Sequence, residues 1–218
     1  MELLQIALVG GVLALDATSV GQFMVSRPLV AGALTGWLLG DPSLGLAVGA
    51  LLELYLLVSF PSGGARFPEG ATATVVAVAS ALAVDGPGAI PLGVAAGLVW
   101  GQVGGVSVTV LRRLNGRLVS DADTGTPERL VRAHLAAMAL DALRGASVTL
   151  VGAALSRWTV AWLADGWPLE GEDSLGLLLV GGAVSGGIFL RDLGGFRRRR
   201  VLLATGMAVG LVGARFLS

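Results

Sequence analysis

The sequence has no cysteine, no lysine and a single histidine among its 218 residues. Without cysteine there can be no disulfide or thiolate metal site, and one histidine is weak evidence for a metal centre or a phosphoryl carrier. Charged residues make up only 14% of the chain, against about 25% in an ordinary soluble domain. The net charge is zero, which argues against nucleic-acid binding. The sequence also lacks a Walker A loop, an HExxH motif and a GxGxxG after a strand, so it shows no nucleotide site.

Hydrophobic residues dominate the rest of the composition. They make up 54% of the chain, and the mean hydropathy is +0.80. The 34 glycines favour close helix packing and broken helices in a membrane. These features predict an all-α polytopic membrane protein, one domain over 1–218, with about six to eight membrane segments that include short broken or re-entrant helix pairs. The N-terminus lacks a basic n-region, which favours a retained first helix over a signal peptide.

The stretch 27–57, RPLVAGALTGWLLGDPSLGLAVGALLELYLL, holds two apolar runs joined by a Gly-Asp-Pro-Ser turn. Each run is shorter than the roughly 20 residues that a membrane-crossing helix needs. The second run contains Glu53, and a carboxylate in a membrane is costly unless it faces a wet cavity or a partner. Short, interrupted membrane segments with a buried charge are typical of a transporter's substrate site. Glu53 is therefore predicted to accept a hydrogen bond from a substrate hydroxyl or to accept a proton, or else to pair with Arg27 or Arg66.

Other polar residues in apolar segments have two interpretations each. Asp16 and Gln22 lie in the second half of an expected first span, 3–25, either on a stripe that faces protein or water or at a helix end near an interface. Asp41 lies in the Gly-Asp-Pro turn and is expected to bond its own backbone, although it can also serve the site. Asp141 and Arg144 are spaced i, i+3, which favours a structural ion pair within one helix.

The basic segments predict which loops lie inside the cell. Segment 112–132 contains five arginines and is expected to be a cytoplasmic loop with a helix start at Thr126-Pro127, and 197–200 is a block of four arginines. The acidic loop 165–173 is then outside, and both termini are expected outside as well. Arg27 and the Pro/Gly-rich loop 61–70, which carries Arg66 and Glu69, fall on the cytoplasmic side, where the loop is a candidate gate.

The stretch 27–57 resembles the IIC subunit of the mannose/fructose/sorbose family of bacterial phosphotransferase (PTS) permeases. That family typically shows an Arg-Pro-Leu opening, a Leu-Gly-Asp turn and a Gly-x-x-x-Glu segment. In this sequence they read Arg27-Pro28-Leu29, Leu39-Gly40-Asp41 and Gly49 to Glu53. The likeness continues more weakly through Gly63-Gly64, Pro68-Glu69, Gly101-Gln102 and Gly181-Gly182. Family members often carry a Gln and a His shortly before the Arg-Pro pair, where this chain has Met24 and Ser26.

The resemblance implies a multi-pass subunit of the inner (plasma) membrane that binds and translocates a hexose or amino sugar. Its implied partners are a IID membrane subunit and soluble IIA and IIB phosphocarriers, in an oligomer. Phosphoenolpyruvate would supply the energy and IIB the phosphoryl group, so this subunit needs no cofactor and no catalytic residue. The alternatives are a non-transporting scaffold or regulatory paralogue, and an ion-coupled secondary sugar transporter that uses Asp16 or Glu53. The predicted sugar-binding residues are Glu53, Asp16, Gln22, Arg27, Asp41, Arg66 and Glu69.

Overall fold

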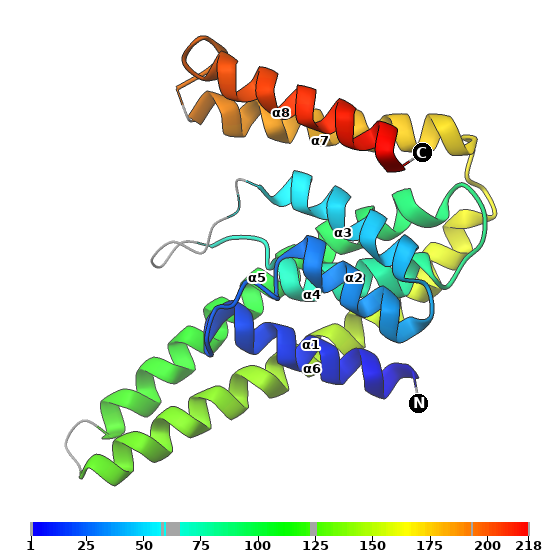
Figure 1. Ribbon diagram of the computed structural model, residues 1–218. Coiled ribbons are helices and arrows are strands. Elements are labelled where there is room, and N and C mark those ends of the chain that lie inside the picture. The colour runs from blue at the N-terminus through cyan, green and yellow to red at the C-terminus, as the bar shows by residue number, and fades with distance from the viewer. Residues whose placement is uncertain (1, 58, 60–65, 123–125, 193, 218) are drawn as a thin grey trace.

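The computed structural model describes residues 2–57, 59, 66–122, 126–192 and 194–217, which form eight α-helices and no strand (Figure 1). The all-α prediction is therefore confirmed. The helices are α1 (Glu2–Thr18), α2 (Pro28–Leu39), α3 (Pro42–Leu56), α4 (Gly70–Ala81), α5 (Ala89–Ala122), α6 (Pro127–Ala164), α7 (Gly171–Asp192) and α8 (Phe196–Leu217).

Three of these helices, α5, α6 and α7, are long and apolar enough to cross a membrane, whereas α2, α3 and α4 are apolar but short. With 34 and 38 residues, α5 and α6 reach about 51 and 57 Å at 1.5 Å per residue. A hydrocarbon core is only about 30 Å thick, so both helices extend well beyond it. Figure 1 shows this extension as an antiparallel pair that leaves the body of the molecule.

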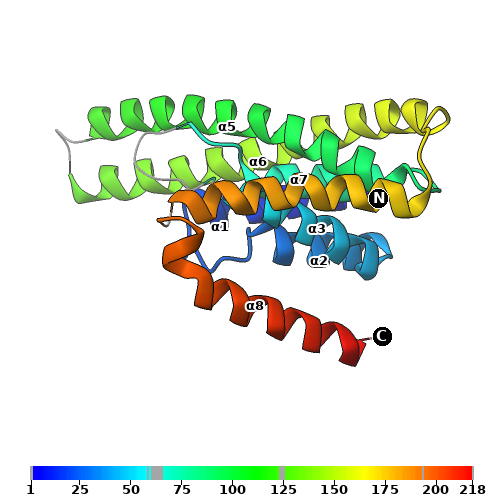
Figure 2. The ribbon, with the colours of Figure 1, turned by 90° about the horizontal axis from the view of Figure 1, so that it is seen from above.

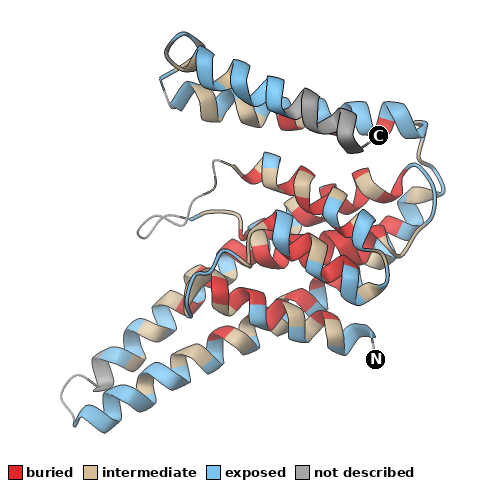
Figure 3. Cartoon of the chain, in the orientation of Figure 1, coloured by how far each residue is buried: buried red, intermediate tan, exposed pale blue. Residues whose placement is uncertain are grey.

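The short helix α4 forms the centre of the packing. Every residue from Ala71 to Ala81 is buried, because α1, α2, α3, α5 and α6 all pack around this helix. Its side chains are small or β-branched on every face, which is the pattern of a helix without a solvent side. Figure 3 shows the buried residues gathered around α4 and the outer faces of the longer helices exposed. Trp158 and Trp162, each 72% exposed on α6, belong to that apolar outer surface, which suits contact with lipid.

Helices α2 and α3 form the short antiparallel pair that the sequence predicts. Gly32 and Gly36 on α2 face Gly45 and Gly49 on α3, so each helix carries a GxxxG motif at the contact. A Cβ atom on Gly45 would lie 2.4 Å from the carbonyl oxygen of Gly32 and 2.6 Å from the Cα of Gly36. The two backbones therefore touch, and only glycine fits at these positions.

Two expected segments differ from the structure. The first helix ends at Thr18 rather than near residue 25, because Gly21, Gln22 and Met24 take positive φ angles that a helix cannot contain. Segment 112–132 is mostly helical rather than a loop. α5 continues to Ala122 and α6 begins at Pro127, with 123–125 outside the described residues. Arginine and leucine are good helix formers, so α5 continues into its charged part.

The connections fall at two opposite ends of the molecule. The end of α3, the facing ends of α5 and α6, and the facing ends of α7 and α8 lie at the left end of Figures 1 and 2. Both termini, the α2–α3 turn and the α6–α7 connection lie at the right end. This grouping is the one that the predicted topology requires, with the arginine-rich ends together and the acidic connection opposite. The assignment of the left end to the cytoplasm stays a prediction.

Candidate functional site

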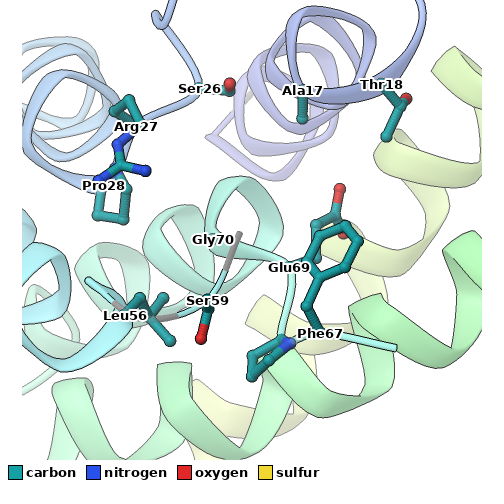
Figure 4. A pocket seen from close by; sticks show the side chains of 11 residues that line it. Ala17, Thr18, Ser26, Arg27, Pro28, Leu56, Ser59, Phe67, Glu69 and Gly70 are labelled. Carbon is teal, nitrogen blue, oxygen red and sulfur yellow. The ribbon is translucent and has the colours of Figure 1, made fainter. Parts of the chain in front are cut away.

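A cavity of about 90 Å³ lies where the end of α1, the start of α2, the end of α3 and the start of α4 meet. Figure 4 shows Arg27 on one side of it, with Thr18, Phe67 and Glu69 across from it. Its wall combines charged, hydroxyl and apolar groups at the ends of short helices. The lining residues are Ala17, Thr18, Ser26, Arg27, Pro28, Leu56, Ser59, Phe67, Pro68, Glu69 and Gly70.

Glu69 is the acidic side chain of this wall and is only 1% exposed. It sits just before α4, and its backbone N–H donates to the carbonyl oxygen of Gly101 at 2.9 Å. Both carboxylate oxygens accept from the guanidinium of Arg144, at 2.9 Å for Oε1 and 3.1 Å for Oε2. The Thr72 hydroxyl also donates to Oε2, at 2.7 Å. Such a two-pronged bond to arginine fixes the orientation of the carboxylate.

Asp141 completes this buried ion cluster. Its carboxylate accepts from Nε of Arg144 at 3.0 Å and from the hydroxyls of Thr18 and Ser19 at the end of α1. The predicted structural pair of Asp141 and Arg144 is therefore confirmed, although Arg144 also reaches Glu69. The cluster joins α1, α4 and α6 and carries two negative charges against one positive charge.

Arg27 and Glu53 form the second ion pair at the site. Arg27 precedes α2 and lines the cavity, and its guanidinium donates to Oε1 of Glu53 on α3. Oε2 of Glu53 accepts from the backbone N–H of Leu29 at 3.3 Å. The side chains are 26% and 20% exposed, so the pair is only partly buried. Of the two interpretations of Glu53, the structure shows the pairing with Arg27. Glu53 itself does not line the cavity, but it binds Arg27, which does.

Asp16 organises the connection between α1 and α2. Its carboxylate accepts from the backbone N–H groups of Phe23, at 2.7 Å, and Ser26, at 2.8 Å. These bonds hold a segment in which Gln22 and Met24 have φ angles of 51° and 65°, which non-glycine residues rarely adopt. Asp16 therefore does not need to touch a ligand to affect the cavity, because it fixes the loop that carries the cavity residues Ser26 and Arg27.

Gln22 lies at a second, polar cavity of about 150 Å³, which shares Ala17 and Thr18 with the first. Ser19, Arg112 and Asn115 also line this second cavity. The guanidinium carbon of Arg112 lies 5.5 Å from the ring centre of Phe67, a residue of the first cavity. The two cavities are therefore neighbours on either side of the end of α1.

The structure thus brings together Arg27, Glu53 and Glu69, with Asp16 and Gln22 close by, but it separates Asp41 from them. Asp41 is the N-cap of α3, where its carboxylate accepts from the N–H of Leu44 at 2.9 Å, as the turn motif predicts. It lies at the opposite end of the α2–α3 pair. Arg66 is exposed next to the cavity residue Phe67, and residues 61–65 of the predicted gate lie outside the described part of the chain.

Sequence reasoning missed several residues of this site. Thr18, Ser26 and Ser107 were not among the predicted site residues, because a lone hydroxyl in an apolar sequence does not by itself indicate a site. Arg144 was recognised as a member of an ion pair, but its bond to Glu69 spans 75 positions of the chain. No local signal connected Arg144 with Glu69, because Arg144 already had Asp141 as its expected partner and Glu69 was expected in a loop.

The sequence profile of a known family matches this chain. The family is described as the sorbose-specific IIC component of the PTS system, and it matches residues 1–185. The chain belongs to this IIC family. The resemblance in the stretch 27–57 therefore identified the family correctly, and the all-α architecture is that of a polytopic membrane protein.

Individual relatives of this IIC chain have modest identity. The sorbose-specific EIIC component of Klebsiella pneumoniae is 30% identical over 134 residues, which cover 60% of this chain and 50% of the relative. The mannose-specific EIIC component of Escherichia coli K12 is 28% identical over 127 residues, 56% of this chain and 47% of the relative. The fructose permease IIC component of Bacillus subtilis is 30% identical over 158 residues, 71% of this chain and 56% of the relative. The chain thus matches about half the length of these relatives.

Two solved structures share the fold of this IIC chain. One, described as a membrane protein, has a TM-score of 0.77 at 20% identity, and the match covers 99% of this chain and 92% of the other. The second is the cryo-EM structure of the mannose transporter ManYZ with microcin E492, with a TM-score of 0.62, the same identity and the same coverage. At this identity the likeness establishes the fold alone.

Proposed function

We propose that this chain is the membrane-embedded IIC subunit of a PEP-dependent sugar phosphotransferase system. It binds a hexose or amino sugar and moves it across the inner (plasma) membrane for phosphorylation by a IIB partner. The sugar site is the cavity between the end of α1 and the starts of α2 and α4. The observation that carries this proposal is the polar wall that Arg27, Ser26 and Glu69 give to a cavity among apolar helices.

The chemistry of this wall suits a polyhydroxylated, uncharged ligand. A sugar hydroxyl both donates and accepts, a guanidinium only donates, and an ionised carboxylate only accepts. Arg27 and Glu69 therefore supply the two complementary partners, and Ser26 and Thr18 add hydroxyls that can do either. Phe67 supplies an aromatic ring to the same wall, which suits the apolar face of a sugar. In this proposal the chain positions the sugar and excludes water, while IIB supplies the phosphoryl group.

The energy for uptake comes from other proteins in this proposal. The sequence shows no nucleotide-binding motif, and membership of the IIC family supports a division of labour among subunits. We propose a IID membrane partner, soluble IIA and IIB phosphocarriers, and assembly as an oligomer. The arginine-rich ends of α5, α6 and α8 lie at the same end of the molecule as the end of α3 that reaches the cavity, which supports delivery of the sugar toward the phosphocarriers.

Co-expression with the genes that neighbour this one tests the proposal. Cells are given labelled mannose, fructose, sorbose and N-acetylglucosamine in turn, and the labelled products inside are separated. We expect one sugar to appear in phosphorylated form, and only when this chain is present. Unphosphorylated sugar whose uptake depends on the proton gradient would select the ion-coupled transporter instead. No accumulation of any labelled sugar would select the scaffold paralogue.

A further inference from the structure

The carboxylate of Glu69, a residue of the cavity wall, is held by Arg144, a residue that does not line the cavity. Arg144 lies on α6, and its side chain is 8% exposed. It is absent from the cavity wall, yet its two terminal nitrogens bind both oxygens of Glu69. The orientation of Glu69 in the cavity is therefore set by a residue behind it.

Arg144 uses four of its five N–H donors within the protein. Besides the two bonds to Glu69, Nε donates to Asp141 at 3.0 Å and one terminal nitrogen donates to the hydroxyl of Ser107 at 2.9 Å. Asp141 lies on the same helix and Ser107 on α5, so the planar guanidinium is fixed from two directions. A lysine in its place would keep the charge but could not form the fork that fixes the plane of the carboxylate.

Helix α5 has a glycine, Gly104, where it packs against the Glu69 carboxylate. A Cβ atom at Gly104 of α5 would lie 2.7 Å from Oε2 of Glu69 and 2.5 Å from the hydroxyl oxygen of Thr72. The absence of a side chain at position 104 therefore leaves the room that the carboxylate occupies. Arg144, Ser107 and Gly104 together define one position for the carboxylate.

Glu69 retains capacity for a ligand in this position. An ionised carboxylate offers about four acceptor positions, and three are taken by the two N–H groups of Arg144 and the hydroxyl of Thr72. The remaining position belongs to Oε1. A sugar hydroxyl in the cavity can donate to it only if Arg144 keeps the carboxylate turned as it is.

We propose that Arg144 is the positioning residue of the sugar site and that it acts on sugar affinity through Glu69. This inference rests on the proposed function and adds a residue of α6 that touches no sugar. Asp141 and Ser107 orient Arg144, and Arg144 orients Glu69. Sugar affinity is therefore set partly by a contact among α4, α5 and α6 outside the cavity.

The test is a double-mutant cycle on the chain co-expressed with its partner subunits. The variants are Arg144→Lys, Glu69→Gln and both together, and the readout is the sugar concentration that gives half-maximal uptake, normalised to the amount inserted in the membrane. Arg157→Lys is the matched control, because Arg157 also lies on α6 and pairs with a carboxylate, Glu2, at 3.1 Å but far less buried. Glu69→Gln removes one of the two buried negative charges and leaves Arg144 and Asp141 as a neutral pair.

We expect Arg144→Lys to raise the half-saturating sugar concentration about tenfold, the effect of losing roughly one hydrogen bond between charged groups. Arg157→Lys should leave it unchanged. In the Glu69→Gln background, Arg144→Lys should add less than about twofold, because the residue through which it acts is gone. If Arg144→Lys fails to insert, Ser107→Ala takes its place with an expected rise of roughly threefold.

The inference would be overturned if Arg144→Lys left the half-saturating sugar concentration unchanged. It would also be overturned if Arg144→Lys raised that concentration equally in the wild-type and Glu69→Gln backgrounds. Either result would leave the proposed function intact. A wild-type chain that supports uptake of no sugar with its partners present would overturn the proposed function, and the inference with it. The wild-type measurement distinguishes these two failures.

Discussion

Arg27 and Glu53 join the open end of the α2–α3 pair, at the point where the pair meets the cavity. The glycine contacts hold the two helices together along their length, and this ion pair fixes the guanidinium of Arg27 at the cavity wall. Glu53 therefore contributes to the site by holding a residue that lines it. This position also explains how a carboxylate is tolerated in an apolar segment.

Replacement of Glu53 by glutamine should lower sugar uptake by about tenfold or more, since Arg27 loses its charged partner and its fixed position. Insertion of the variant protein into the membrane should be normal, because the Arg27–Glu53 pair is partly exposed and contributes little to stability. Labelled sugar uptake per inserted protein measures the effect. Glu2→Gln, which breaks the exposed pair with Arg157, is the control and should transport normally. Normal uptake by Glu53→Gln would show that this pair has no part in the site.

Gly45→Ala should destabilise the protein by about 1–3 kcal/mol, the usual cost of overpacking. Its Cβ atom would lie 2.4 Å from a carbonyl oxygen of α2, and backbone atoms cannot move aside as a side chain can. Gly176→Ala on α7 is the control, because nothing lies within 4 Å of its added Cβ. The melting temperature in detergent should fall for Gly45→Ala and hold or rise for Gly176→Ala. Equal melting temperatures would contradict the close contact of α2 and α3.

Arg144→Leu should prevent accumulation of folded protein, because it leaves two buried carboxylates without their cation. Loss of one partner from a buried ion pair costs about 3–5 kcal/mol. Arg157→Leu breaks an exposed pair on the same helix and should cost less than about 1 kcal/mol. The amount of monodisperse protein after extraction measures both. Adding Glu69→Gln to Arg144→Leu should restore part of the yield, and a failure to do so would contradict the charge argument.

Asp16→Asn should loosen the connection between α1 and α2. Aspartate accepts from two backbone N–H groups, one on each carboxylate oxygen, whereas asparagine keeps a single acceptor oxygen. Hydrogen exchange at the amides of Phe23 and Ser26 should speed up by about tenfold or more, and uptake should fall because Ser26 and Arg27 lose their fixed place. Asp85→Asn, at an exposed turn, is the control. Unchanged exchange at Phe23 and Ser26 would contradict the role of Asp16.

Much of the fold follows from local sequence signals. The turn at Gly40-Asp41-Pro42 and the shortness of its flanking runs predict the α2–α3 pair, and Asp41 caps α3 as the motif indicates. Proline at the first helical position predicts the start of α6 at Pro127. The i, i+3 spacing predicts the pair of Asp141 and Arg144. Each of these features depends on residues within a few positions of one another.

Features that depend on distant residues could not be read in the same way. The end of α1 at Thr18 depends on an Asp16 carboxylate that captures amides 7 and 10 residues later. The bond between Arg144 and Glu69 depends on the packing of α6 against α4. The charges in 112–132 indicate a polar environment but do not reveal whether the backbone is helical, and the structure shows that α5 continues into it. Long-range packing decides these points, and local pattern does not.

The most direct test of the sugar cavity uses the absence of cysteine from this chain. A single thiol is introduced as Ser26→Cys in the cavity wall and, as a control, as Ser43→Cys in the exposed first turn of α3. The rate of maleimide labelling of this chain, within its complex, is measured with and without the transported sugar. The account predicts that saturating sugar slows labelling at position 26 by about fivefold or more, as expected for a largely enclosed site, and leaves position 43 unchanged. Equal labelling of position 26 with and without sugar would contradict the placement of the sugar site in this cavity.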